Sequence, residues 1–419
     1  MTISLGSPSR KLLITAIAVL CLGVYFALAA RELAADWLGN RVELKSLQWA
    51  ARLDPGNADY RNHLGRYYDL VVRDPAAALS YYKAAVQLNP HSARYWFDLA
   101  SAYQVLGDVA NQTFALERAI QADSMTPDVA WEAANLYLVQ GQNEKALREY
   151  SVVMANDASL AATAIQFCWR IDPDVDSLLR DVVPHNAAAY IALLSLLENK
   201  GNTDGSMKVW DALVRSGEPY EARDAFDYIH YLILNKQVDE AVSAWNAATV
   251  RFHYTSYRPS ANNLIVNPMF NLDVLNAGFD WQYQKQSGIT LTLDPSEFRA
   301  GRRSLLIGFD GPGIHDAGFY QFVVVQPNTT YEFSAYYKNG DIEGAGGPHL
   351  TIQDMYTQAV YFDSDELKEA AGFWKSIDGE FTTGPDCKLV VLHIRRIPEG
   401  SPIRGKLWID DFHLRQKRS

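Results

Sequence analysis

Three patterns of apolar and polar positions follow one another along the chain, and the first is an uncharged run. Residues 12–30 read LLITAIAVLCLGVYFALAA, and Arg10 and Lys11 stand directly before them. At 1.5 Å per residue this run makes roughly 28 Å of helix, close to the hydrocarbon thickness of a bilayer. Because basic residues tend to stay on the cytoplasmic side, the pattern predicts a cytoplasmic tail over 1–11, a transmembrane helix over 12–30, and everything after Arg31 outside.

Two other interpretations of this run stay open. Ala27-Leu28-Ala29 has the small-x-small form that a signal peptidase accepts, so the alternative is secretion after cleavage. The third interpretation is a buried soluble helix, although such a helix normally keeps one polar face. The length of the apolar run, with Arg31-Glu32 directly after it, favours the anchor. The anchor and the cleaved signal both place the bulk of the chain outside the cytoplasm.

The second pattern is a repeat of 34 residues. Alanines, tyrosines and glycines recur at this interval: Ala85 and Ala119, Ala100 and Ala134, Tyr103 and Tyr137, Gly107 and Gly141. Small residues at fixed positions let two helices approach closely, and aromatic residues fill the space to the next pair. These residues and their spacing resemble the tetratricopeptide repeat (TPR), which implies an all-α superhelix of antiparallel helix pairs over about residues 40–252. We count three clear repeats and two or three degenerate ones, with the consensus lost between 157 and 184.

The resemblance also implies a groove for a protein partner, because the first helix of each repeat lines the concave face in this family. The positions that line the concave face in this family correspond here to Tyr60, His63, Tyr67, Arg94, Phe97, Ser101, Gln104, Asp128, Trp131, Asn135 and Leu138. Aromatic side chains beside polar ones suit a peptide or loop, because they give contact area at little ordering cost. For Phe97 and Trp131, packing between repeats is the alternative interpretation.

The third pattern begins after a linker over 253–261 and has a period of two. Tyr331, Phe333, Ala335 and Tyr337 alternate with more polar residues, and Val390, Leu392 and Ile394 form a second such series. Alternation of this kind is typical of strands that bury one face. Eight to ten short strands over 262–416 predict an all-β sandwich of two sheets.

The order of the motifs in this region resembles carbohydrate-binding modules with a galactose-binding-like jelly roll. The motifs are the opening NLIVNPMF at 263–270, GFDW at 278–281, AGRRSL at 300–305 and the closing LWIDDF at 407–412. Many relatives place a glutamate after the opening phenylalanine and use it on a structural calcium ion. Here that position is Asn271, so a calcium site with Asp410 and Asp411 is an expectation that this departure puts in question.

We expect a polysaccharide ligand, if there is one, on an outward face of the sandwich. The alternation that places Tyr337 inward places Tyr336 outward, and comparable phases select the remaining members of the face: Gln321, Gln353, His393 and Arg395. Sugar sites use an aromatic plate for the apolar face of the ring and planar polar groups for the hydroxyls. The alternative is a sandwich that is structural or contacts protein.

Composition narrows the classes of function. With 419 residues the chain is long enough for two or three domains, and its formal net charge of −11 disfavours nucleic acid as a partner. Cys21, Cys168 and Cys387 are too few for a disulfide scaffold, and we expect them to be apolar fillers. No motif of nucleophilic, phosphate-transfer or zinc chemistry is present, so we expect no enzyme.

Two hypotheses of function remain, with a glycan-active enzyme as a minor third. In the first, the chain is a membrane-anchored scaffold of the cell envelope, in which the TPR groove binds a protein and the sandwich binds glycan, in polysaccharide assembly or export. In the second, both modules are protein-docking domains and the sandwich fold is merely reused.

Overall fold

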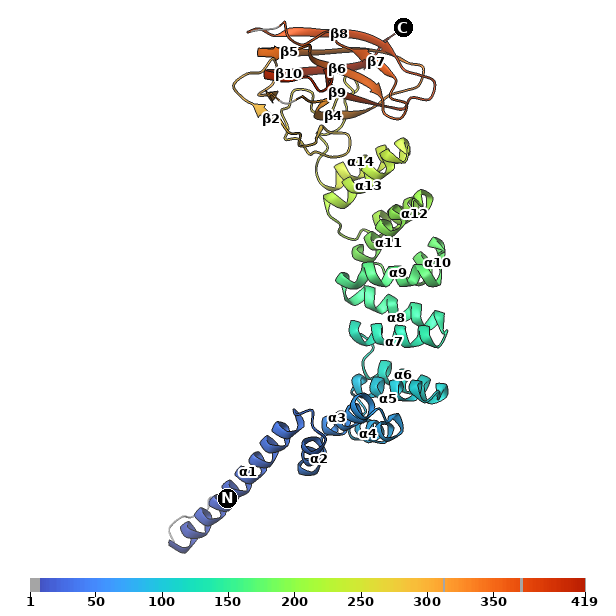
Figure 1. The fold of residues 1–419 in the computed structure, drawn as a ribbon, viewed down its shortest axis with the longest axis vertical. Coiled ribbons are helices and arrows are strands. Elements are labelled where there is room, and N and C mark those ends of the chain that lie inside the picture. The colour runs from blue at the N-terminus through green and yellow to red at the C-terminus, as the bar shows by residue number, and fades with distance from the viewer. Residues whose placement is uncertain (1–7, 312, 370–371, 419) are drawn as a thin grey trace. The chain divides into compact units, whose positions relative to one another are not determined.

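The computed structural model describes residues 8–311, 313–369 and 372–418. The chain divides into two compact units, the first ending at Glu218 and the second beginning at Pro219. Helices make up the first unit, and the second unit combines one helix pair with two β-sheets (Figure 1). An all-α region followed by an all-β sandwich is the fold class that the sequence predicts.

The helices of the first unit are α1 (Pro8–Gly39), α2 (Leu44–Leu53), α3 (Ala58–Arg66), the π-helix η1 (Tyr67–Val72), α4 (Pro75–Leu88), α5 (Ala93–Val105), α6 (Val109–Ala122), α7 (Pro127–Val139), α8 (Asn143–Asn156), the 3₁₀ turn η2 (Ala158–Leu160), α9 (Ala161–Ile171), α10 (Val175–Asp181), α11 (Ala187–Asn199) and α12 (Thr203–Ser216). The helix pair of the second unit is α13 (Ala222–Leu234) and α14 (Val238–Arg251). Consecutive helices such as α5 and α6, or α7 and α8, pack against each other as antiparallel pairs.

The repeat of 34 residues is present in these pairs. Ala85, Ala100, Ala119 and Ala134 all have no exposed surface, because each lies where two helices meet. Gly107 and Gly141 end the first helix of successive pairs with φ angles of +73° and +71°. A residue with a Cβ adopts this left-handed conformation only with strain, so the glycine makes the tight turn between the paired helices. The helical region is therefore a TPR-like array.

α1 has the length and composition of a membrane anchor or a signal peptide, and in the described part of the chain it is the one helix that does. Of the predicted tail, residues 1–7 lie outside the described residues, and Pro8–Lys11 are helical. The last turns of α1 belong to the helical array. Ala35 is buried in a cluster with Leu47 of α2 and Tyr60 of α3. The membrane-type helix thus runs into the first helix layer without a linker.

The thiols of Cys168 and Cys387 are buried, as the sequence predicts, whereas Cys21 is exposed on α1. Removal from water disfavours the thiolate, and burial raises the pKa of both buried thiols to about 12. A thiol that stays protonated is a poor nucleophile, so neither cysteine is set up for chemistry.

Ten strands form two antiparallel sheets in the second unit. The first sheet has the order β1-β4-β9-β6-β7 and the second the order β2-β3-β10-β5-β8. The strands are β1 (Gln282–Tyr283), β2 (Ile289–Asp294), β3 (Ser304–Asp310), β4 (Asp316–Val324), β5 (Thr330–Gly344), β6 (Gly347–Asp354), β7 (Val360–Asp363), β8 (Lys375–Thr382), β9 (Leu389–Ile397) and β10 (Ile403–Gln416). Among these strands, only β2–β3 and β6–β7 pair strands that follow each other in the chain, and every other pair joins segments that are distant in sequence.

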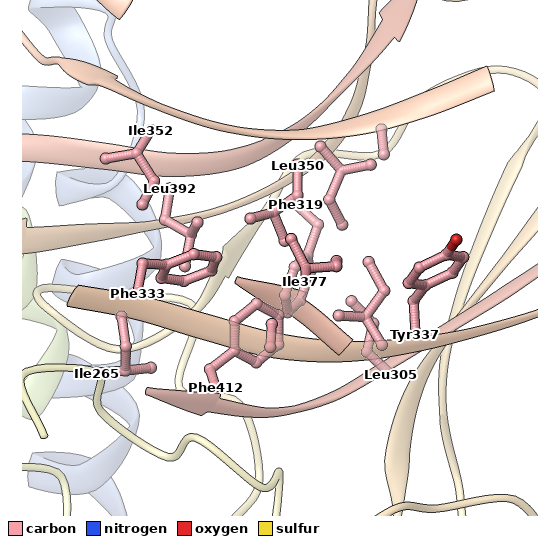
Figure 2. Packing of buried hydrophobic residues seen from close by; sticks show 14 of the residues in the cluster. Ile265, Leu305, Phe319, Phe333, Tyr337, Leu350, Ile352, Ile377, Leu392 and Phe412 are labelled. Atoms are coloured by element: carbon pink, nitrogen blue, oxygen red, sulfur yellow. The ribbon is translucent and has the colours of Figure 1, made fainter. Parts of the chain in front are cut away.

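The core lies between the two sheets. Phe319, Leu350, Ile352 and Leu392 come from the first sheet, and they meet side chains of the second such as Phe333 (Figure 2). The predicted inward series Tyr331, Phe333, Ala335 and Tyr337 is buried, and so is the series Val390, Leu392 and Ile394. The phase of both strands was therefore predicted correctly.

The helix pair α13–α14 is fixed to the sandwich within the second unit. Trp245 of α14 is buried, donates from Nε1 to the carbonyl of Tyr257 at 3.1 Å, and packs edge-on against Phe279. Tyr356, in the loop after β6, donates its hydroxyl to the carbonyl of Ile233 in α13 at 2.9 Å. Together these contacts hold both helices against loops of the sandwich.

Candidate functional site

The first sheet presents an outer face that carries a concentration of polar side chains. Since Leu350, Leu392 and Phe319 point into the core, their neighbours along β6, β9 and β4 point outward. The register aligns Tyr320 with His393 and His393 with Thr351, which gives one row across three strands. We call the outward side chains of these strands the His393 face, namely Asp316, Tyr320, Phe322, His349, Thr351, Gln353, Val391, His393 and Arg395.

His393 lies at the centre of this face and makes one hydrogen bond. Its Nδ1 lies 2.6 Å from Oδ2 of Asp316, and because a carboxylate only accepts, Nδ1 carries the proton. Oδ1 of Asp316 in turn accepts from the amide of Gly318 at 2.6 Å. This arrangement fixes the orientation of the imidazole ring. The second ring nitrogen, Nε2, is buried and has no hydrogen-bond partner among the described residues.

Tyr320 supplies an aromatic ring beside His393. Its hydroxyl donates to Oε1 of Gln282 at 3.2 Å, and its ring packs edge-on against Phe322 with centroids 5.3 Å apart. Burial raises the pKa of Tyr320, so the phenol stays neutral. The ring is half-buried, which leaves part of an apolar surface open beside a planar amide.

Arginine and histidine side chains around the face lie beside carboxylates. Arg395 lies 2.7 Å from Glu399, and His315 lies 3.0 Å from the same carboxylate. Hydrogen bonds from both side chains lower the pKa of Glu399. His349 lies 3.6 Å from Asp363. Arg395, His315 and His349 therefore each already have a carboxylate neighbour.

Three of the five residues predicted for glycan binding lie together on this face. Gln353, His393 and Arg395 all point outward from β6 and β9 of the first sheet. Tyr336 was wrongly grouped with them, because it belongs to β5 of the second sheet and so lies on the opposite side of the sandwich. The guanidinium of Arg299 stacks on its ring, 4.6 Å from the centroid, and occupies one face of the ring.

Gln321 was also predicted wrongly, since it points inward and has no exposed surface. The opening segment of the domain passes beside it, and both atoms of its amide are used by one residue of that segment. Oε1 accepts from the amide of Val266 at 3.0 Å, and Nε2 donates to the Val266 carbonyl at 2.9 Å. Gln321 is thus a structural residue.

Three residues of the His393 face were not predicted from the sequence, namely Asp316, Tyr320 and His349. They follow from the same alternation once the register is known.

The residues expected to hold calcium make hydrogen bonds within the protein. Both oxygens of Asp410 are occupied by backbone amides: Oδ2 accepts from Arg299 and Ala300, and Oδ1 accepts from Asp411. Asp411 lies 3.1 Å from Nε2 of His413. Asn271 offers only an amide oxygen, next to Gly301. Among the described residues there is no group of three or more acidic, histidine or cysteine side chains that could hold a metal.

Some of the positions predicted for the protein groove are buried between helices, and others keep exposed surface. Tyr60 and Phe97 were assigned wrongly, because they are 7% and 3% exposed and belong to the packing between helices. Tyr67 lies in the π-helix and packs on the cluster around Tyr60. The imidazole of His63 reaches back to the carbonyl of Gly39 at 3.2 Å.

Trp131 packs between repeats, as the alternative interpretation held. Its ring meets those of Tyr150 and Phe167 edge-on, at 5.4 and 5.7 Å. Asn135 accepts a hydrogen bond from the hydroxyl of Tyr150 at 2.9 Å. Some surface remains on the predicted positions, since Arg94 and Asp128 are exposed and three others are half-buried: Ser101, Gln104 and Leu138.

Comparison with known families supports the interpretation of the sandwich. Residues 262–398 match the model of the family described as carbohydrate binding domain, CBM_4_9. The sandwich is carbohydrate-binding-module-like. A solved structure described as CBM4 structure and function is 16% identical and covers 36% of this chain and 99% of its own, with a TM-score of 0.28. The CBM22-1 xylan-binding domain from Paenibacillus barcinonensis is 14% identical and covers 38% of this chain and 98% of its own, with a TM-score of 0.26.

The helical region is similar to other solved structures. The protein MamA is 22% identical and covers 42% of this chain and 86% of its own, with a TM-score of 0.24. PilF of Pseudomonas aeruginosa is 16% identical and covers 54% of this chain and 95% of its own, with a TM-score of 0.26. No curated protein matches the chain. The family match indicates a binding role for the sandwich, which is a non-catalytic kind of domain.

Proposed function

We propose that this protein is a membrane-anchored, non-enzymatic scaffold of the cell envelope that binds a polysaccharide on the His393 face. The observation that carries the proposal is the unpartnered Nε2 of His393, on the outer face of a domain of a carbohydrate-binding family. A buried polar atom without a hydrogen bond costs on the order of 1–3 kcal/mol. A sugar hydroxyl that bonds to Nε2 recovers this free energy.

The His393 side chain is 13% exposed but Nε2 itself is buried, so a hydroxyl reaches Nε2 once a neighbouring side chain moves. Arg395, two positions along the same strand and 30% exposed in its side chain, is a long neighbour with freedom to do so. The imidazole stays in place because Asp316 holds Nδ1. Tyr320 then provides a stacking surface, and Gln353, whose Nε2 donates to Gln358 at 2.8 Å, offers its amide oxygen to a further hydroxyl.

The charge of the face favours a neutral polysaccharide. The guanidinium of Arg395 is already paired with Glu399, and His349 lies beside the carboxylate of Asp363. An acidic glycan would have to compete with these carboxylates, and the chain as a whole carries −11. A neutral chain of sugars meets no such opposition.

The helical region supplies the protein-binding part of the scaffold. Val105 and Val139 occupy the same position of successive repeats, and each is 66% exposed. Leu106 and Val109 extend the exposed apolar surface at the turn between α5 and α6. Exposed apolar residues that gather at one place are typical of protein contacts. Arg94 and Asp128 add polar contacts to the same array.

The N-terminal helix holds this array at a membrane. α1 carries Arg10 and Lys11 in its first turn, is apolar along the predicted span, and packs its last turns against α2 and α3. The basic residues favour an inside N-terminus and an extracytoplasmic body. In this arrangement the protein connects a membrane, a protein partner and a polysaccharide in the assembly or export of that polysaccharide.

A glycan array probed with the full-length protein in detergent tests the glycan part of the proposal. We expect retention on neutral polysaccharides, and at least a tenfold loss of affinity for His393→Ala and for Gln353→Ala, whose side chain is half-buried. Tyr336→Ala is the matched control, because it lies on the opposite sheet and should bind as the wild type does. The proposal fails if no polysaccharide is retained, or if the His393 and Gln353 variants bind normally.

A further inference from the structure

A hollow beside the His393 face is formed jointly by helix α13 and the sandwich. It has a volume of about 380 Å³. α13 contributes Arg223, Phe226, Asp227 and His230, and the sandwich contributes loop residues 275–278 together with Gln282, Tyr283 and Tyr320. Three aromatic rings thus line the same hollow as amide, imidazole, guanidinium and carboxylate groups.

The wall that α13 forms is held firmly. Phe226 packs on Trp245, with ring centroids 5.7 Å apart. Trp245 lies so close to Gly278 that a Cβ there would collide with the indole ring. At the other end of the helix pair, Lys388 of the sandwich lies 2.6 Å from Asp239 of α14. Contacts at both ends prevent α13 from swinging away from the sheet.

The hollow and the His393 face form one surface. Tyr320 lines the hollow and also stands in the row with His393. Gln282 is a second link between the hollow and the His393 face. Its Oε1 accepts from Tyr320, and its Nε2 donates to the carbonyl of Gly278 at 2.7 Å. Tyr283, 47% exposed, stands on the side of the hollow nearest the solvent. A ligand that lies across the face is therefore directed toward α13.

The chemistry of the hollow suits sugars. Aromatic rings such as Tyr283 and Tyr320 offer flat apolar surfaces, and Asp227, His230 and Gln282 offer acceptors and donors for hydroxyls. Arg223 and Asp227 lie 3.5 Å apart on successive turns of α13, so the helix brings no unbalanced positive charge to the site. An acidic ligand gains nothing from this wall.

We propose that α13, a helix of the TPR-like array, forms the outer subsite of an extended polysaccharide site that begins on the His393 face. This inference rests on the proposed function of that face. The five strands of the first sheet extend over about 19 Å, at roughly 4.8 Å per strand, and the hollow adds side chains of α13 to the site beside β1 and β4. The site thus takes an internal stretch of a polysaccharide, and short oligosaccharides occupy only its sheet portion.

Calorimetric titration of the full-length protein with gluco- and xylo-oligosaccharides of two to six units tests this inference. In the wild type we expect affinity to increase with length. His230→Ala and Asp227→Ala should lower the affinity for the hexasaccharide about tenfold while leaving that for the shortest bound oligosaccharide unchanged. Glu240→Ala, an exposed carboxylate on α14 outside the hollow, is the matched control.

The outcomes separate this inference from the proposed function. If His393→Ala abolishes binding of every length but the α13 variants bind the hexasaccharide as the wild type does, the outer subsite is refuted and the sheet site stands. If His393→Ala binds every length normally, the function proposed for the sheet is refuted, and the outer subsite with it. Because Asp227 and His230 are exposed, the melting temperature of their variants should not change, and a large decrease would also contradict their placement.

Discussion

Asp280 predicts an unusual dependence of stability on pH. Its side chain is fully buried next to the helix pair, Oδ2 accepts from the amide of Leu275 at 2.7 Å, and Oδ1 has no partner among the described residues. Burial raises the pKa of this carboxyl from 3.8 to about 7. Between these two values the folded state holds a proton that the unfolded state has lost. The free energy of unfolding therefore falls as the pH rises from about 4 to about 7, and is level above that.

The difference of roughly three pKa units corresponds to an upper bound of about 4 kcal/mol lost across this range. Asp280→Asn keeps the shape and an acceptor for Leu275 but carries no charge, so it should be the more stable protein at pH 8, while near pH 4 the two should be similar. Denaturant unfolding at pH 4, 6 and 8, followed by hydrogen exchange of peptides from β5 and β10, measures the effect in the sandwich. Asp365→Asn, at an exposed carboxylate, is the control. Parallel pH profiles for the wild type and Asp280→Asn would refute the reasoning.

Three further predictions concern other parts of the chain. Ala119→Leu should destabilise the helical unit by roughly 1–3 kcal/mol, because Ala119 is completely buried where α6 meets α5. Hydrogen exchange should show the loss of protection in these helices and not in the sandwich. Leu20→Arg should release the protein from membranes in an alkaline-extraction assay, since a charge at a helix centre costs roughly 3 kcal/mol on insertion; continued retention would count against the anchor. Chelation with EDTA should leave the melting temperature of the sandwich unchanged, because backbone amides already occupy the oxygens of Asp410, and a decrease would reveal a bound cation.

The features that the sequence predicted well are those encoded at fixed spacing. Ala100 and Ala134, or Gly107 and Gly141, are 34 positions apart because each repeat presents the same contacts to the next, so the register is readable without knowledge of the structure. The inward phase of Tyr331 to Tyr337 is readable for a similar reason, because successive residues of a strand alternate between two faces.

The assignment of strands to sheets could not be predicted in this way. Tyr336 and Gln353 are both outward, yet β5 and β6 belong to different sheets although they follow each other directly in the chain. A local pattern shows which face of its own sheet a residue occupies, but it does not show which sheet the strand joins. The candidate site was therefore predicted only in part, with His393, Arg395 and Gln353 placed together correctly and Tyr336 assigned to the wrong side.

The candidate site was predicted only in part for a second reason. The sequence does not show which polar side chains already have all their hydrogen bonds within the protein. Gln321 and His393 were predicted on the glycan face from the alternation of their strands, and Asp410 was expected to hold calcium because of the family resemblance. In the structure, both amide atoms of Gln321 are used by Val266, and the oxygens of Asp410 are used by three backbone amides. His393 alone of these three keeps a ring nitrogen without a partner. Polar groups whose bonds are satisfied internally stabilise the fold and gain little from a ligand, whereas an unsatisfied one gains a bond when the ligand arrives. For this reason the effect of His393→Ala on binding, compared with that of Tyr336→Ala, is the measurement on which the proposed site depends most directly.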